Sequence, residues 1–435
     1  MSKPLVLVTA PIKTRSGYGN HARDICTALI DSDKYEVLIN GCRWGNTPLT
    51  ALEKGNPQHD KIAQRLLTNP KLPKQPDLHI HIVIPNEVQP VGKKNIGITA
   101  GIETTIPIPQ WLDGANKMDK VLFTSKFTEE VFKNAEFEDK NKQLMKFTKP
   151  SMALFEGFDP EVYKETNVFS EDVKSAFDKI DSNWNFLFVG HWLSGKLGQD
   201  RKDTGMLVKV FLESFKNQKN PPGLILKSSG ADFSILDREE LLGKINDIKK
   251  SVNGVLPPIY LIHGDFTDSQ MNELYNHSKV KAHVTFTHGE GFGRPLLEAT
   301  QSGKPVIAPG WSGHVDFLNQ NYAVLLPGTL NRAPKEAFPK DILMDVPENK
   351  WITVNYSVAS NIMRDIHKNY QKYLVKAKQL QIYTKQKFSF ESMKDILGKK
   401  VDSVLDTLPK SVELKLPKLN KVDDKKINLP KLKKA

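Results

Sequence analysis

Short runs of aliphatic and β-branched residues alternate with amphipathic stretches along most of the chain. In the first 150 residues the short runs predict strands, and the stretches with helical periodicity predict helices. The predicted strands cover residues 5–9, 35–40, 78–84, 95–99 and 121–124, and the predicted helices cover 21–30, 62–67 and 127–133. This alternation is typical of a parallel α/β sheet.

The alternation weakens over residues 149–183, where Pro150, Gly157 and Pro160 interrupt it, so we expect a domain boundary there. It then resumes, with strands expected at 185–189, 224–226, 259–262, 282–286, 305–308 and 323–326, and helices at 206–215, 237–250, 268–277, 294–302, 358–382 and 390–405. The fold class is therefore α/β, with two Rossmann-like, doubly wound domains facing across a cleft. Such sheets bind ligands at the carboxyl ends of their strands.

We expect the first domain to cover residues 1–165 and the second to cover 166–385, followed by a C-terminal helix at 386–407. Residues 408–435 contain Leu-Pro-Lys three times. Proline at this density disfavours a helix, so this segment is interpreted as a flexible, lysine-rich tail.

The composition is that of an ordinary globular protein, with 39% hydrophobic and 26% charged residues. No apolar run approaches the ~20 residues that a membrane-spanning helix needs. The apolar stretch at residues 5–10 is too short for the core of a signal peptide. Two cysteines, Cys26 and Cys42, form neither a disulfide framework nor a zinc site. We expect a soluble cytoplasmic protein.

The net charge of +12 is unevenly distributed. Residues 408–435 hold nine lysines and three acidic residues, which gives this segment half of the total. A basic body with a basic tail favours an anionic partner such as a nucleotide, nucleic acid or anionic membrane. Lysines far outnumber the nine arginines, which favours phosphate contacts over reading of bases. Solubility alone explains the lysines equally well.

The stretch from His288 to Glu298 carries the clearest chemistry. A strand is expected to end near residue 287, a glycine-rich turn follows, and a helix is expected to begin at Arg294. Backbone N–H groups at the start of a helix attract anions, and glycines let a ligand approach the backbone closely. Glu290 lies on the turn, and Glu298 lies one helical turn beyond Arg294. Two carboxylates eight positions apart therefore flank one anion-binding turn.

This stretch, with Gly303-Lys304-Pro305-Val306-Ile307-Ala308 after it, resembles the retaining nucleotide-sugar glycosyltransferases of the GT-B fold, the family 4-like group with the Glu-x7-Glu signature. The resemblance extends over about residues 1–400. It includes a glycine loop at 16–19, a linker at 155–160, a strand end at 188–190 followed by Arg201-Lys202, and a second strand end at 262–264.

The resemblance implies roles for individual residues. Lys202 is expected to neutralise the donor diphosphate, and Glu290 to contact the transferred sugar, so these two are the expected catalytic residues. The family usually has arginine where this chain has His191, so a second cation is expected from Arg294 or Lys196. Further expected donor-binding residues are His191, Gly264, Gly291, Phe292, Gly293, Arg294 and Glu298, the last of them at the ribose. Expected in the acceptor and phosphate loops are Gly17, Tyr18, Gly19 and Glu103.

The implied activity is transfer of a hexose or pentose, with retention, from a UDP- or GDP-sugar to a hydroxyl acceptor. The first domain is then the acceptor domain and the second the donor domain. The family requires no metal or other cofactor. Two alternatives stay open. The first concerns the acceptor, which is a glycan or lipid-linked glycan or, as the basic charge allows, a hydroxylated base in DNA. The second is that the chain binds nucleotide sugars without catalysis. In either case the tail has nucleic acid or an anionic membrane as its expected partner.

Overall fold

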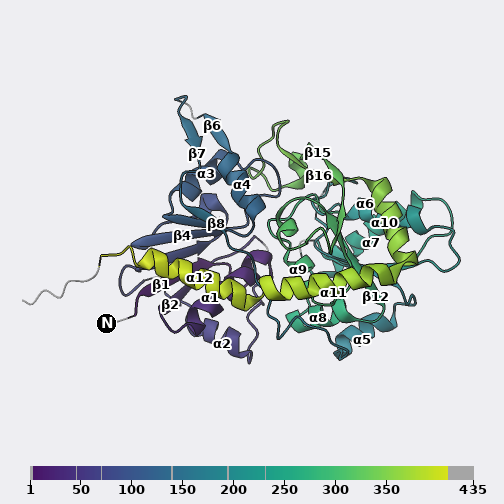
Figure 1. The fold of residues 1–435 in the computed structure, drawn as a ribbon, viewed down its shortest axis with the longest axis horizontal. Coiled ribbons are helices and arrows are strands. Elements are labelled where there is room, and N and C mark those ends of the chain that lie inside the picture. The colour runs from purple at the N-terminus through teal and green to yellow at the C-terminus, as the bar shows by residue number, and fades with distance from the viewer. Residues whose placement is uncertain are drawn as a thin grey trace, which may run out of the picture.

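The computed structural model describes residues 3–409, except residues 46, 70, 139–140, 194 and 231. The predicted lysine-rich tail therefore lies outside the described residues, apart from its first two positions. The described chain folds into two α/β domains that lie side by side (Figure 1).

The sheet of the first domain has six strands in the order β2-β1-β3-β4-β5-β8, and every neighbouring pair is parallel. Its four central strands carry the long apolar runs, and their side chains are almost wholly buried. The strands are β1 (Leu5–Ala10), β2 (Glu36–Gly41), β3 (Leu78–Ile82), β4 (Lys94–Thr99), β5 (Lys120–Phe123) and β8 (Ser151–Ala153).

The sheet of the second domain repeats this plan, with six parallel strands in the order β11-β10-β9-β12-β13-β14. The strands are β9 (Asn185–Val189), β10 (Gly223–Lys227), β11 (Ile259–Ile262), β12 (Val280–Val284), β13 (Val306–Pro309) and β14 (Val324–Leu326). Two Rossmann-like, doubly wound domains are therefore confirmed.

Twelve helices are described, most of them close to their predicted ranges. They are α1 (Gly17–Asp31), α2 (Pro57–Ala63), α3 (Pro109–Asn116), α4 (Lys126–Asn134), α5 (Glu171–Asp178), α6 (Thr204–Phe215), α7 (Ile235–Lys250), α8 (Asp268–Asn276), α9 (Arg294–Thr300), α10 (Tyr356–Lys368), α11 (Tyr370–Lys387) and α12 (Phe390–Leu405).

Two helix predictions were wrong in detail. The helix expected at 62–67 is α2, which begins earlier because the Asn56 side chain caps its N-terminus and Pro57 occupies its first position. The single helix expected at 358–382 is two helices. Asn369, with φ −117° and ψ 38°, leaves the helical region between α10 and α11.

An antiparallel hairpin in the second domain was not anticipated. It consists of β15 (Gly328–Arg332) and β16 (Lys350–Val354). The segment between these strands places Phe338, Ile342 and Leu343 against a hydrophobic cluster of the first domain. Backbone hydrogen bonds reinforce this contact, with Thr105 N donating to Lys350 O at 2.9 Å. The hairpin therefore joins the two domains. A shorter pair, β6 (Glu136–Glu138) and β7 (Leu144–Lys146), projects from the first domain (Figure 1).

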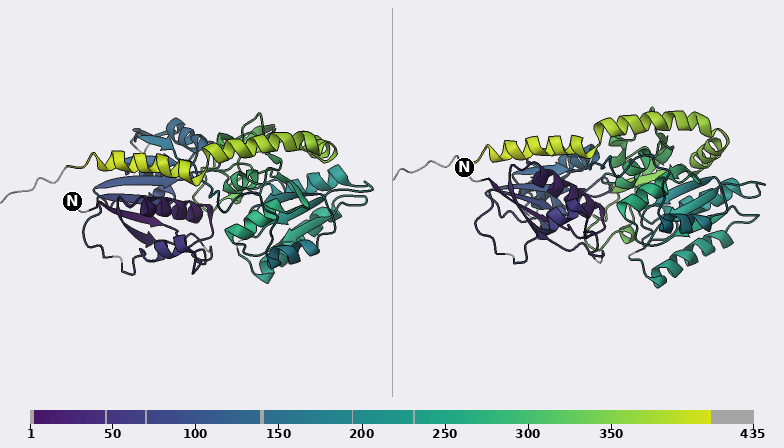
Figure 2. Two further views of the ribbon diagram at one scale, coloured as in Figure 1. Left: turned by 60° about the horizontal axis from the view of Figure 1, so that its bottom comes forward. Right: turned by 90° about the horizontal axis from the view of Figure 1, so that it is seen from below.

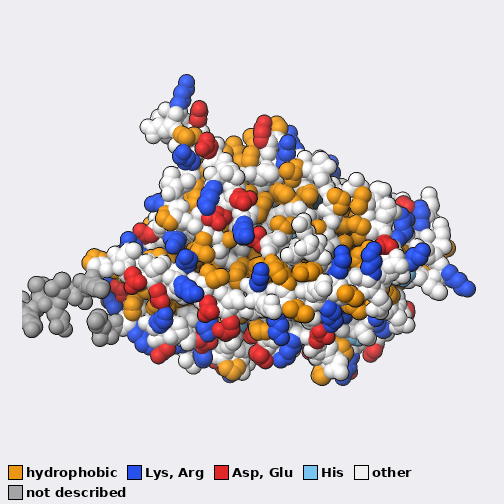
Figure 3. Space-filling model, viewed as in Figure 1, with side chains coloured by type: hydrophobic (Ala, Val, Ile, Leu, Met, Phe, Trp, Pro, Cys, Tyr) orange, Lys and Arg blue, Asp and Glu red, His pale blue; other side chains and the backbone are white. Residues whose placement is uncertain are grey.

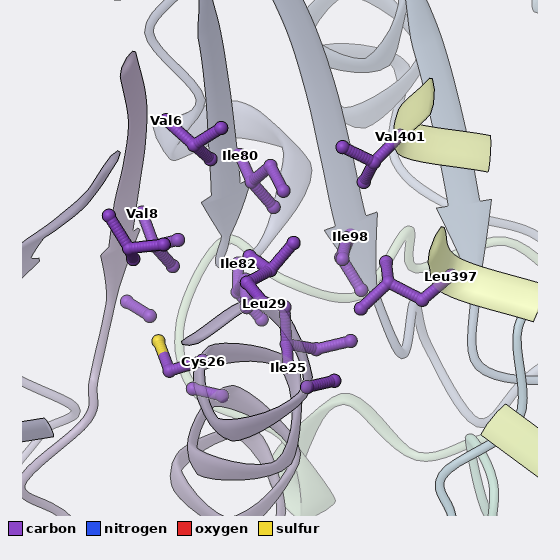
Figure 4. Close-up of a cluster of buried hydrophobic side chains, with 14 of the residues drawn as sticks. Val6, Val8, Ile25, Cys26, Leu29, Ile80, Ile82, Ile98, Leu397 and Val401 are labelled. Carbon is purple, nitrogen blue, oxygen red and sulfur yellow. The ribbon is translucent and has the colours of Figure 1, made fainter. Parts of the chain in front are cut away.

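The last helix returns to the first domain. In Figure 2, α11 runs along the second domain and α12 continues along the first. Leu397 and Val401 of α12 enter the same buried cluster as Ile25 and Leu29 of α1 (Figure 4). The chain thus crosses between the domains twice, and the two crossings touch, because Phe390 N donates to Phe158 O at 2.7 Å.

The face drawn in Figure 3 carries Lys and Arg interspersed with Asp and Glu, with hydrophobic side chains between them. It shows no uninterrupted block of positive charge. Within the described part of the chain, no helix combines the length and apolar character needed to cross a membrane.

Candidate functional site

The glycine-rich turn at residues 289–293 lies between β12 and α9, where the motif predicted it. Gly293 caps α9 with φ +93°, a left-handed conformation that favours glycine. The loop after β13 fixes the turn from the other side. Glu290 N donates to Ser312 Oγ at 2.9 Å, and Gly313 N donates to Glu290 O at 2.9 Å. The loop after β13 therefore holds the turn in place.

The same turn packs directly against the first domain. A Cβ added to Gly289 would lie 2.6 Å from the carbonyl oxygen of Glu103, and one added to Gly291 would lie 2.6 Å from that of Ala100. Thr124 Oγ1 also donates to Gly291 O at 3.2 Å. Only a bare backbone fits here, so the glycines of the motif bring the two domains together at the predicted site.

Lys202 and Glu290, the two expected catalytic residues, form an ion pair. Their side chains are each only 13% exposed. The loop that carries Lys202 is anchored to the end of β12, because His288 N donates to Arg201 O at 3.0 Å. Burial disfavours the charged carboxylate of Glu290, but the attraction of Lys202 and Arg201 outweighs it and lowers the pKa of Glu290.

The second cation at this point is Arg201, where Arg294 or Lys196 was expected. Arg201 donates to Glu103 Oε1 at 2.6 Å and lies close enough to Lys202 and Glu290 to influence both. Lys196 is exposed. Burial and the positive charge of Arg201 lower the pKa of Lys202. Because Lys202 and Arg201 repel each other, an additional anion at this point would be stabilised.

His191 and Gly264 lie at the carboxyl ends of β9 and β11. His191 Nδ1 is 3.0 Å from Ser229 Oγ. Although the residue as a whole is exposed, the protein around its ring and the neighbouring Lys202 lower the pKa of His191 to about 4. Lys227, at the end of β10, donates to Gly264 O at 2.5 Å. Burial lowers the pKa of Lys227 to about 8. The described residues thus place a third buried cation near the predicted donor loops.

Glu298 and Arg294, both on α9, form a second charged group. Arg294 Nε donates to Glu298 Oε1 at 2.9 Å, and its Nη1 donates to Asp24 of α1 in the first domain. Tyr275 Oη donates to Glu298 Oε2 at 3.3 Å. Burial raises the pKa of Glu298 to about 7, against the opposing effect of Arg294. The Arg294 side chain therefore pairs with two carboxylates, whereas the sequence predicted a contact with the donor.

The predicted loop at residues 16–19 begins α1, with Ser16 as its N-cap. Gly17 has open space around it, whereas Gly19 packs tightly on Thr14. Tyr18 Oη lies 2.9 Å from Thr99 Oγ1 and accepts a hydrogen bond from Ala100 N at 3.0 Å. Since Ala100 also touches Gly291, Tyr18 reaches the same seam between the domains as the glycine turn.

Phe292 was among the expected donor-binding residues, and its side chain points into the second domain. It is 2% exposed and packs in the hydrophobic core, with its ring 5.0 Å from that of Phe317. Its aromatic side chain anchors the turn to the domain.

Sequence reasoning did not single out Asp24, Lys227 or Glu156. Lys227 had a detectable signal, because it follows a buried apolar run at the predicted carboxyl end of a strand. Asp24 had none, since its neighbours in the fold are distant in the sequence, and Glu156 had only its place in the predicted linker. Glu156 lies in the linker, is 5% exposed, and its Oε2 atom has no hydrogen-bond partner within the described structure.

We expect Glu156→Gln to stabilise the protein at alkaline pH. Burial raises the pKa of Glu156 from 4.5 to about 8, with Arg294 opposing and Asp24 reinforcing the shift. The folded state therefore binds a proton that the unfolded chain releases, and wild-type stability falls as pH rises from about 4.5 to about 8. The shift sets an upper limit of about 5 kcal/mol for the gain in unfolding free energy. Urea unfolding at pH 5 and pH 8 measures it.

Glu161→Gln is the matched control, because Glu161 is close by in the sequence and 85% exposed. Its unfolding free energy should follow that of the wild type at both pH values. A Glu156→Gln variant that gains nothing between pH 5 and pH 8 would show that the carboxyl is ionised in the folded protein.

A hollow of about 770 Å³ adjoins the glycine turn on the second domain. It lies between β14, the β15–β16 hairpin and α11, and its lining includes Trp311, Leu325, Leu330, Ile352 and Tyr373. Trp311 connects the hollow to the turn, because a Cβ added to Gly289 would lie 3.1 Å from its ring.

Neither a protein-family model nor a curated protein sequence matches this chain. Solved structures do match it. Sucrose-phosphate synthase from Thermosynechococcus elongatus has 12% identity and a TM-score of 0.61, covering 94% of this chain and 100% of its own. Anabaena HepE in complex with UDP-glucose has 16% identity and a TM-score of 0.57, covering 92% and 99%. An E. coli trehalose-6-phosphate protein bound with UDP-2-fluoro glucose has 11% identity and a TM-score of 0.59, covering 94% and 100%.

At these identities the likeness establishes the fold. The arrangement of the two domains is the one found in these proteins, and the expected GT-B fold class is confirmed.

Proposed function

We propose that this protein is a retaining glycosyltransferase that uses a nucleoside-diphosphate sugar as donor. The observation that carries the proposal is the meeting of Lys202 and Glu290 at a glycine turn lying between two Rossmann-like domains. The similar structures support it, because HepE was solved with UDP-glucose and the E. coli protein with UDP-2-fluoro glucose.

The proposed chemistry depends on the diphosphate leaving group. As the bond between the sugar and the phosphate breaks, negative charge grows on the phosphate oxygens. Lys202 and Arg201 are fixed cations close to this point, and the backbone amides of residues 291–293, beside α9, are proposed as further donors. Preorganised charges of this kind stabilise a developing anion without reorganisation, which is an effective form of catalysis. The proposed reaction therefore requires no metal ion.

The two glutamates have different proposed roles. Glu290 pairs with Lys202 and so lies next to the proposed diphosphate, where it can accept hydrogen bonds from hydroxyls of the transferred sugar. Glu298 lies further along α9 and is proposed to bind the ribose hydroxyls. The ends of β10 and β11, with Lys227 and Gly264, are the proposed location of the base. No side chain is assigned as a covalent nucleophile, in keeping with the proposed retaining family.

The acceptor is proposed to enter beside the first domain, near Tyr18 and Glu103, because both side chains face the glycine turn. A hydroxylated base in DNA is a second candidate acceptor, which the net charge of +12 allows. Binding of DNA through phosphate contacts weakens steeply as salt concentration rises.

A donor screen with Glu298→Gln tests the proposed function. We expect one UDP- or GDP-sugar to raise the melting temperature of the wild type, because a ligand that binds only the folded state stabilises it. Glu298→Gln should bind this donor about tenfold more weakly, since one hydrogen bond to a charged group contributes roughly 1.5–3 kcal/mol. Transfer is then assayed in the presence of EDTA, with glycans and with DNA containing hydroxylated bases, and the anomeric configuration of the product is read by NMR.

Glu273→Gln serves as the control, because Glu273 lies on α8 and pairs with Ser170 away from the turn. Inversion at the anomeric carbon would contradict the proposed mechanism. Equal donor binding by the wild type and Glu298→Gln would contradict the assignment of the ribose site, and binding without transfer to any acceptor would favour the non-catalytic alternative.

A further inference from the structure

The Arg294 side chain connects the two domains. It extends from the first residue of α9 in the second domain to Asp24 on α1 in the first. Arg294 is 8% exposed and Asp24 is 18% exposed, so the pair is largely screened from water. The same guanidinium also donates to Glu298, with 2.9 Å between Nε and Oε1. One planar cation is thus held by carboxylates from both domains.

The ionisable groups around Arg294 are mostly acidic or neutral. His21, one turn before Asp24 on α1, is 2% exposed, and burial followed by the charge of Arg294 lowers its pKa to about 3, so it stays neutral. Glu156 of the linker and Tyr163 beyond it also lie within electrostatic range of Arg294. Acidic groups from α1, α9 and the linker therefore surround a single guanidinium at the point where the chain crosses between domains.

Because the guanidinium is rigid, its contacts with Asp24 and Glu298 are geometrically coupled. Its N–H groups form a planar fork, so fixing one edge on Asp24 also fixes the direction of the edge that faces Glu298. On an isolated helix, an Arg–Glu pair four residues apart contributes only a few tenths of a kcal/mol and leaves the carboxylate free to rotate. Contact with Asp24 exists only while α1 is docked on α9.

We propose that Asp24 and Arg294 are positioning residues, which orient the Glu298 carboxylate for the donor ribose when the two domains are docked. This inference rests on the proposed function. It replaces the direct donor contact expected for Arg294, and it makes recognition of the donor in the second domain depend on a residue of the first.

The test is a double-mutant cycle that uses UDP and GDP as probes and isothermal calorimetry as the readout. Asp24→Asn preserves shape and removes the charge, and we expect the better nucleotide to bind about tenfold more weakly, a change of 1.4 kcal/mol. In a Glu298→Gln background the same substitution should change the dissociation constant by less than about twofold, because Asp24 acts through Glu298. Asp24→Glu should recover part of the lost affinity.

Asp31→Asn is the matched control, because Asp31 lies on the same helix and pairs with Lys61 at 2.8 Å, outside the site. It should bind nucleotide as the wild type does. Two results would overturn the inference while leaving the proposed function intact. Asp24→Asn could bind nucleotide as tightly as the wild type, or it could lose the same nucleotide affinity in the wild-type and Glu298→Gln backgrounds. Failure of the wild type to bind either nucleotide would instead overturn the proposed function, and the inference with it.

Discussion

Lys202→Met should reduce kcat about 10³-fold, with a similar reduction in kcat/KM for the donor. The expected size follows from the proposed role, because removing one preorganised donor to a developing anion typically costs roughly 10²–10³ in kcat, and Lys202 is a buried full charge. An interaction that strengthens mainly in the transition state lowers both parameters together. Steady-state kinetics with the donor found in the screen measure the effect.

Lys216→Met is the control for this substitution. Lys216 caps the C-terminus of α6, the helix that begins just after Lys202, and it pairs with the exposed Glu213. Its kinetic constants should equal those of the wild type. If Lys202→Met raised only the donor KM and left kcat unchanged, the lysine would contribute to ground-state binding alone, and the proposed role at the leaving group would be wrong.

Gly313→Ala should destabilise the protein and abolish donor binding. The added Cβ would overlap the backbone of Gly291 and lie 2.8 Å from the carbonyl oxygen of Glu290, so neither neighbour can move without displacing the glycine turn. Inserting one carbon atom into a tightly packed site costs about 1–3 kcal/mol, and here the obstacle is backbone rather than a flexible side chain. Denaturant unfolding and nucleotide calorimetry measure the two effects.

Gly398→Ala provides the opposite expectation. Gly398 lies within α12, and an added Cβ there would meet no atom within 4 Å. Alanine in the middle of a helix is favoured over glycine by up to about 1 kcal/mol, so this variant should be slightly more stable than the wild type and bind donor equally well. Normal nucleotide binding by Gly313→Ala would show that the turn is more adaptable than its packing implies.

The order of the elements could be predicted because local patterns determine them. The strand Asn185–Val189 and the helix Phe390–Leu405 have the predicted bounds, since each is an apolar pattern with a clear boundary residue at its ends. The β15–β16 hairpin could not be predicted in this way. Strand Gly328–Arg332 is exposed throughout, so it has no buried face to produce an alternating pattern, and its partner lies about twenty residues further along the chain.

The site was predictable where the contacts are local and was not where they are tertiary. The motif located Glu290, Glu298 and the glycine turn, because their spacing is that of one turn followed by one helix. The partner of Arg294 was missed, since Asp24 lies 270 positions away and nothing in its neighbourhood marks it. Arg201 was not predicted as the second cation for the same reason, because its position depends on the hydrogen bond that its carbonyl oxygen accepts from His288 N.

The return of α12 to the first domain has a consequence for biosynthesis. Leu397 and Val401 complete a core whose other members come mainly from the first hundred residues, so that core stays open until residues 397–401 have left the ribosome. The second domain, by contrast, has all the strands of its parallel sheet by residue 326. Domains generally fold in order from the N-terminus. In this protein, however, the domain that is translated first completes its hydrophobic core last.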